Sequence, residues 1–185
     1  MNKLNKIKTL LEKNYSFKIN KYEYFPKTYK ELKEIINKLI IKYGYECDLN
    51  IINVSNINIF SNLFSAKYYF NGDVLEWDVS NGLYFDYMFS DCKEFNCNLS
   101  KWNVFNSKDF NNMFYKCKSF NADLSNWDVF NGENFNYMFY ECKSFNADLS
   151  NWDVSNAKSW FWFAKNSLLE KYPERIPEKF RYDYL

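Results

Sequence analysis

Asp123-Leu-Ser-Asn-Trp-Asp-Val129, followed by Tyr137-Met-Phe-Tyr-Glu-Cys-Lys-Ser-Phe-Asn146, is the clearest copy of a unit that returns along the chain every 25 residues. A fixed period of this length indicates a stacked repeat architecture. Seven apolar columns stay in phase over the repeats, which chance does not produce. They are Ile52, Trp77, Trp102, Trp127, Trp152; Val54, Val79, Val104, Val129, Val154; Phe60, Phe85, Phe110, Phe135, Trp160; Leu63, Met88, Met113, Met138, Phe163; Phe64, Phe89, Phe114, Phe139; Phe70, Phe95, Phe120, Phe145; and Val74, Leu99, Leu124, Leu149.

The spacing inside one unit predicts its secondary structure. A single unit cannot bury its apolar side alone, so neighbouring units must stack, at about the 4.7–4.9 Å spacing of strands. The alternation Trp-x-Val predicts a short strand, and the spacing i, i+3, i+4, i+7 of Phe85, Met88, Phe89 and Cys92 predicts a short helix. We therefore expect an α/β repeat solenoid in which each coil is a short strand plus a short helix or 3-10 turn.

The two ends of the chain depart from the repeat and are predicted to cover it. Residues 1–48 are expected to form an N-terminal helical cap, residues 49–166 a five-coil solenoid and residues 167–185 a C-terminal capping tail. In the first cap we predict an early helix over residues 3–13. A second helix is expected to begin at a capping box of Thr28 and Glu31 and to end near Gly44. Pro173 and Pro177 break the pattern in the tail.

Polar residues and cysteines repeat with the same period. The two Asn columns are predicted to bind backbone groups of the neighbouring coil, and the Cys column is predicted to pack in the core. The five thiols are expected to be free and reduced, because none shows metal-binding spacing. The columns are Asn56, Asn81, Asn106, Asn131, Asn156; Asn71, Asn96, Asn121, Asn146; and Cys92, Cys117, Cys142.

No enzymatic chemistry is visible in the sequence. The chain has no histidine and only four glycines, which removes the commonest general base and every phosphate-binding glycine loop. Stacked aspartates could hold Ca²⁺ or form a carboxylate pair, but Asn98 and Asn103 interrupt their columns and no Gly-rich loop accompanies them. We predict no catalytic, cofactor or metal site. The two aspartate columns are Asp73, Asp123, Asp148 and Asp78, Asp128, Asp153.

The motifs at Asp123–Val129 and Tyr137–Asn146 resemble the BspA-like leucine-rich-repeat family, in its 25-residue form of bacterial surface lipoproteins. The resemblance covers about residues 50–166, and it implies binding rather than catalysis. Two columns differ from the family pattern. The family's Val is replaced by Gly82, Ser107, Gly132 and Ala157, and its Ser is replaced by Phe105 and Phe130.

Positions that vary between repeats are free to specialise, and they include aromatic and charged side chains of the kind that protein interfaces use. Phe105 and Phe130 stand one coil apart in a Ser column. We expect both rings to form an exposed patch; the alternative is that they turn inward and fill the space at Ser107 and Gly132. The predicted partner-binding residues are Phe105, Phe130, Tyr84, Tyr87, Tyr115, Tyr137, Tyr140, Lys108, Glu133 and Trp162.

The function predicted from these features is protein–protein interaction inside a bacterial cell. The chain opens without an export signal and has no apolar run that could span a bilayer, which predicts a cytoplasmic protein without a membrane partner. A narrower hypothesis is a phage or mobile-element inhibitor of a host defence nuclease, similar to an anti-CRISPR. The alternatives are a surface adhesin or a lectin-like module that lacks its export signal. Nucleic acid could bind only at the Lys-rich first 46 residues, which carry eleven Lys against five Glu.

Overall fold

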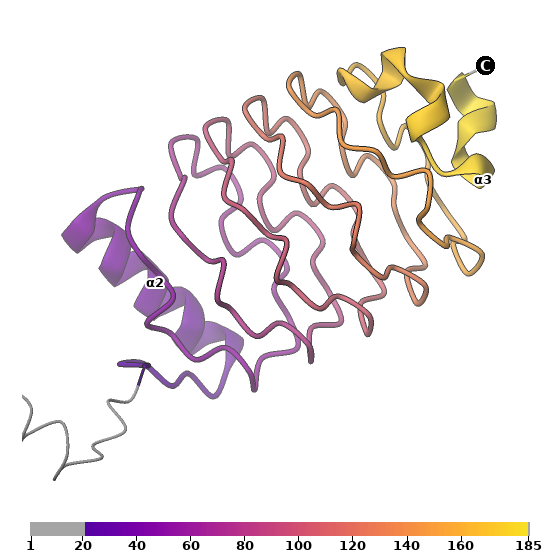
Figure 1. Cartoon of the computed structure of the whole chain (residues 1–185). Coiled ribbons are helices and arrows are strands. Elements are labelled where there is room, and N and C mark those ends of the chain that lie inside the picture. Colours follow the sequence, from indigo (N-terminus) through magenta and orange to yellow (C-terminus); the bar gives the residue numbers. More distant parts are fainter. Residues whose placement is uncertain (1–20, 185) are drawn as a thin grey trace, which may run out of the picture.

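The computed structural model describes residues 21–184, and it places a stack of similar coils between two helical ends (Figure 1). The helix α2 (Tyr29–Tyr43) lies at the N-terminal end of the stack. The C-terminal end carries short helical turns, η1 (Leu169–Lys171), η2 (Pro173–Arg175), α3 (Glu178–Arg181) and η3 (Tyr182–Tyr184). The helix predicted over residues 3–13 lies outside the described residues.

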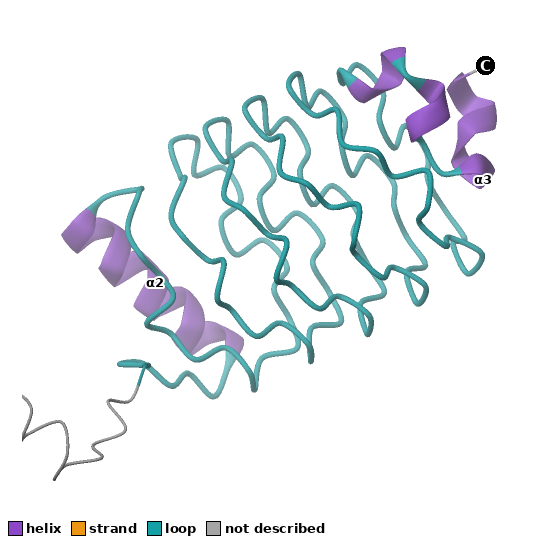
Figure 2. Cartoon of the chain, in the orientation of Figure 1, coloured by secondary structure: helices purple, strands orange, loops and turns teal. Residues whose placement is uncertain are grey.

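The predicted fold class, an α/β repeat solenoid of strand-and-helix coils, is wrong. Between α2 and η1 the chain runs through turns and loops, without a helix and without a strand (Figure 2). The β-type pairing in residues 21–184 consists of isolated parallel bridges, such as Ile59–Tyr84, Tyr84–Asp109 and Asp109–Asn134. The coils are therefore stacked turns, joined by separate backbone hydrogen bonds such as those from Phe85, Phe89 and Asp91 to the next coil, and they do not form a continuous sheet.

Successive turns replace the helix predicted around Phe85. The amides of Met88 and Cys92 donate to the carbonyls of Phe85 and Phe89, so each turn closes after three residues. The amide of Tyr87 donates to Asn111 of the next coil instead of to its own segment, at 2.9 Å. A chain of such turns points its first and fourth residues inward, and this reproduces the 3–4 apolar spacing of a helix. The spacing alone could not separate the two structures.

The strand predicted along Trp-x-Val is absent. Hydrogen bonds from side chains to the backbone join neighbouring coils there instead. The indole Nε1 of Trp102 donates to the carbonyl of Val74 at 2.9 Å, and the amide Nδ2 of Asn106 donates to the carbonyl of Ser80 at 2.8 Å. The same two bonds recur in the neighbouring coils. Because these side chains supply the bonds between coils on this side, the backbone does not need the pairing of a strand.

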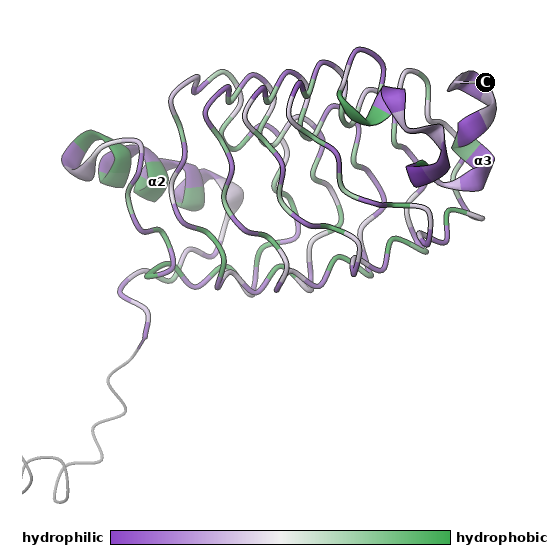
Figure 3. Ribbon diagram, turned by 45° about the horizontal axis from the view of Figure 1, so that its top comes forward, coloured by the Kyte–Doolittle hydropathy of each residue, from purple (hydrophilic) through white to green (hydrophobic). Residues whose placement is uncertain are grey.

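The apolar columns form the core, as predicted. Phe114 is fully buried and lies face to face with Phe89 and Phe139, at ring-centroid distances of 5.7 and 5.6 Å. Within its own coil it stacks on Phe120 at 4.1 Å. Aromatic stacking of this kind adds to the free energy gained by burying the rings. Figure 3 shows hydrophobic and hydrophilic positions alternating along the coils, since each turn sends side chains in and out.

The cysteine column takes part in the bonding between coils as well as in packing. The thiol of Cys117 donates to the carbonyl of Phe89 and that of Cys142 to the carbonyl of Phe114, both at 2.9 Å. Burial raises the pKa of the Cys92 thiol to about 12, and it also raises the pKa of Cys117 and Cys142. All five cysteines are free. At neutral pH these thiols therefore stay protonated and unreactive.

We predict that a thiol reagent at pH 8 modifies at most two cysteines of the native protein quickly, and five after denaturation. The partly buried Cys97 should react first, although burial raises its pKa to about 11. Because the column thiols are buried and protonated, their modification should follow the unfolding rate. Three or more fast thiols in the folded state would contradict the buried column.

Both ends of the stack are covered. In α2, the side chain of Thr28 accepts from the amide of Glu31 at 3.2 Å, and Leu32, Ile36 and Leu39 are buried. At the other end the ammonium of Lys179 donates to three carbonyls of the last coil, those of Val154, Ser155 and Ala157. These contacts satisfy backbone groups that a further coil would otherwise bind.

Candidate functional site

A partly exposed aromatic cluster lies on the C-terminal half of the stack. Tyr140 stacks on Tyr115 at 5.1 Å and on Trp162 at 5.6 Å, with interplanar angles of 9° in both pairs. Tyr137 meets the other rings edge-on, and Phe161 stacks on Trp162 at 5.0 Å. Trp162 and Phe161 are 42% and 52% exposed, whereas the three tyrosines are half-buried. We call Tyr115, Tyr137, Tyr140, Phe161 and Trp162 the aromatic cluster.

Two residues of the cluster have a backbone conformation that is unfavourable for an aromatic residue. Tyr137 and Trp162 have φ angles of 55° and 51°, in the left-handed region. Asn62 and Asn112 hold the same place in other coils, and Asn tolerates this conformation much better than a bulky aromatic residue. Such strain is of order 1–3 kcal/mol and is concentrated at functional sites. The aromatic residues are therefore a cost to folding at these two places.

A second surface surrounds Phe105 and Phe130, which are 43% and 40% exposed. Both rings line a groove of about 380 Å³ together with Ser125, Asn126, Trp127, Asp128, Asn151 and Asp153. The inward alternative for these rings is not what the structure shows. A Cβ at Gly132 would lie 2.3 Å from the ring of Phe135, so that core ring already fills the space. We call this surface the Phe groove.

The other predicted partner-binding residues lie apart from these two surfaces. Lys108 and Glu133 line a smaller groove of about 290 Å³, in which Glu133 pairs with Lys158 at 2.5 Å. This hydrogen bond lowers the pKa of Glu133. Tyr84 and Tyr87 are 42% and 38% exposed, and they lie outside both the aromatic cluster and the Phe groove. The predicted residues thus fall into separate groups.

The aspartate columns have a local structural role. The carboxylates of Asp78, Asp128 and Asp153 each accept the backbone amide two residues further on, at 3.0–3.1 Å. Asn103 accepts in the same way in its own coil, which explains why Asn can replace Asp in this column. In residues 21–184 no three of the Asp, Glu and Cys side chains come together as metal ligands would.

Sequence reasoning missed Phe161, which contacts two members of the cluster. It stands in a column with Asp86, Asn111 and Asn136, so its change to an aromatic residue was visible in the alignment of the repeats. This substitution is hard to recognise because Phe161 lies between the core positions Trp160 and Phe163. The four consecutive aromatic residues 160–163 look like a single buried segment.

The comparisons with known proteins place the chain in a family but give it no activity. Two overlapping stretches, residues 30–152 and 87–171, match the family described as "Mycoplasma protein of unknown function, DUF285". No curated protein and no solved structure matches the chain. No helix within residues 21–184 has both the length and the apolar character needed to cross a bilayer. Since the two matches together span most of the sequence, this chain belongs to the DUF285 family of Mycoplasma proteins of unknown function.

Proposed function

We propose that the protein is a non-enzymatic module that binds another protein through the aromatic cluster. The observation that carries this proposal is the surface stack of Tyr115, Tyr140 and Trp162, in which the two tyrosines are half-buried and Trp162 is exposed, built on positions that vary between repeats. Tyr and Trp are the residues most enriched at binding hot spots. Their rings are already held against one another, so binding costs little side-chain entropy.

The strain at Tyr137 and Trp162 supports the same proposal. Asn62 and Asn112 in the same column show that this fold also accepts a residue with less strain at this position. Tyr87 carries the same strain at a φ of 56° outside the cluster, so a role of the strained rings in partner contact predicts a loss of binding at Tyr137 and Trp162 alone. Charged groups lie beside the rings: the ammonium of Lys116 is 4.9 Å from the Tyr115 ring, and Lys165 and Asp183 line a pocket together with Phe161 and Trp162. A polar rim around an aromatic centre is the usual arrangement of a protein interface.

The proposal includes a reducing compartment, the bacterial cytoplasm, as the place of action. Its support is that all five cysteines are free, and that the column thiols serve the fold as donors. A narrower form of the proposal is an inhibitor of a host defence nuclease encoded by a phage or mobile element. That form predicts loss of DNA cleavage when the purified protein is added to a CRISPR nuclease in equal amount.

A lectin-like module is the second candidate, and an adhesin would use the same surface outside the cell. The face-to-face rings of Tyr140 and Trp162 favour it, because flat aromatic surfaces also stack on sugar rings. A glycan array separates the two candidates. Glycan binding that requires the aromatic cluster would replace the protein-binding proposal.

We predict that Tyr137→Asn and Trp162→Asn each weaken partner binding by about 30-fold or more, the loss of one hot spot of about 2 kcal/mol. The melting temperature should stay the same or rise, because Asn relieves the left-handed strain. The partner is first captured on the immobilised wild-type protein from the cells that produce it, and its affinity is then measured by calorimetry.

Tyr87→Asn is the matched control for both variants. It makes the same change in the same column, at a φ of 56°, outside the cluster. Its partner affinity should equal that of the wild type. Unchanged affinity of the Tyr137 and Trp162 variants, or an equal loss for the Tyr87 variant, would remove the cluster as the binding site.

A further inference from the structure

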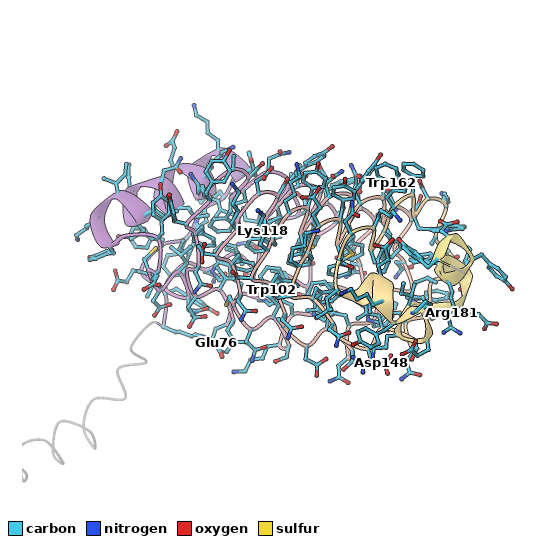
Figure 4. The ribbon with its side chains drawn as sticks, turned by 90° about the horizontal axis from the view of Figure 1, so that it is seen from above. Glu76, Trp102, Lys118, Asp148, Trp162 and Arg181 are labelled. Atoms are coloured by element: carbon cyan, nitrogen blue, oxygen red, sulfur yellow. The ribbon has the colours of Figure 1, made fainter. Side chains whose placement is uncertain are left out.

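The Phe groove lies on the opposite side of the stack from the aromatic cluster. Figure 4 shows Trp162 along one long side and Glu76 and Asp148 along the other. Asn126 and Asn151 of the groove stand in the same repeat column as Glu76, so the groove belongs to the second side. Nothing in the proposed function uses this surface.

The two rings of the groove are presented on a fixed backbone. The amide of Phe130 donates to Asp128 at 3.1 Å, and the carbonyl of Phe130 accepts from the side chain of Asn156 at 2.9 Å. Phe105 is held in the same way by Asn103 and Asn131. Exposed rings on a rigid support are preorganised for contact with a ligand.

The equivalent groove two coils earlier differs from the Phe groove in its charge and in its lack of exposed rings. The earlier groove, of about 270 Å³, is lined by Glu76, Asp78 and Lys101 among others. There Glu76 accepts from both Lys21 and Lys101, which neutralises its charge. Ser55 and Ser80 occupy the column in which the Phe groove has its rings.

The Phe groove keeps its negative charge. Asn126 and Asn151 replace the paired Glu and Lys, so no ammonium lies between the coils there. Within residues 21–184 neither Asp128 nor Asp153 forms a salt bridge. The hydrogen bonds from Ser155 lower the pKa of Asp153, which is ionised at neutral pH. The groove therefore combines two uncompensated carboxylates with two exposed rings.

We propose that the Phe groove binds an arginine side chain from an extended segment of a partner protein. The planar guanidinium stacks on aromatic rings and donates paired hydrogen bonds to carboxylates, so one side chain satisfies both features of the groove. Phosphate groups of nucleic acid would be repelled by Asp128 and Asp153. This site is independent of the aromatic cluster and stands whether or not the cluster binds a protein.

The test is a titration of isotope-labelled protein with the peptide acetyl-Gly-Arg-Gly-Arg-Gly-amide at physiological ionic strength, followed by amide chemical shifts. The shifts should centre on residues 105, 125–130 and 151–153. The same peptide with citrulline has the shape of the first but no charge, and it should bind about tenfold more weakly or worse. Equal binding of the citrulline peptide would overturn the proposal.

Variants that the fold itself tolerates complete the test. Asp128→Asn/Asp153→Asn keeps the acceptor that Asn103 supplies elsewhere, and Phe105→Ser/Phe130→Ser restores the residue of Ser55 and Ser80. Each double variant should weaken the arginine peptide at least about tenfold with an unchanged melting temperature. Asp78→Asn in the earlier groove is the control and should change nothing. An equal loss in this control would show general attraction to negative charge and contradict a specific site.

Discussion

Replacing Phe114 by Asp is expected to unfold the protein at room temperature. Phe114 is fully buried and packs against rings of its own coil and of both neighbouring coils. Removing a core Phe ring costs about 3–5 kcal/mol, and an unpaired buried charge adds to this cost. Because domains of this size are stable by only about 5–15 kcal/mol, little or no stability remains. Circular dichroism during heating and urea titration measures the loss.

Phe105→Asp is the matched control for this variant. It makes the same change in an exposed ring, 43% accessible, and should alter the free energy of unfolding by no more than about 0.5 kcal/mol. A cooperative and unchanged melting curve for Phe114→Asp would show that the inner and outer faces of the coils have been assigned the wrong way round.

Phe180→Asp is expected to cost about 3–5 kcal/mol and to cause self-association. The ring of Phe180 is fully buried over the last coil, where it stacks on Trp160 at 5.0 Å and contacts Phe163 at 5.1 Å. When this cap opens, the last aromatic rings and the carbonyls held by Lys179 become exposed. An uncovered coil end is a template for a second copy. Melting curves and size-exclusion chromatography follow the two effects.

Tyr182→Asp serves as the control, because this residue is two positions away and 77% exposed. It should leave both the melting temperature and the elution volume unchanged. If Phe180→Asp behaves in the same way as Tyr182→Asp, the C-terminal turns do not protect the end of the stack.

The period and the burial of the columns could be read from the sequence because burial depends on side-chain type at a fixed spacing. Trp102 and Phe114 are buried as their columns predict. The local conformation could not be read in the same way. The amide of Tyr87 bonds to the next coil rather than within its own segment, and this choice depends on a neighbour 24 residues away. Local apolar spacing contains no information about that partner.

The two candidate binding surfaces could be predicted in part. Phe105 and Phe130 stood out because they replace Ser in a repeat column, and the structure places both in one groove. The contact between Tyr140 and Trp162 could not be predicted, because these residues stand in different columns and belong to two adjacent coils. The left-handed backbone that carries Trp162 is likewise a property of the turns, which the sequence reading had taken for a helix.

Site-specific photo-crosslinking tests the binding proposal most directly. Phe161 is replaced by p-benzoylphenylalanine, which keeps an aromatic ring at an exposed position of the aromatic cluster, and the protein is irradiated in the cells that produce it. Tyr84, exposed but outside the cluster, is replaced in a parallel experiment. The proposal predicts a discrete protein adduct from position 161 that is absent or much weaker from position 84. No adduct from position 161, or the same adducts from both positions, would contradict it.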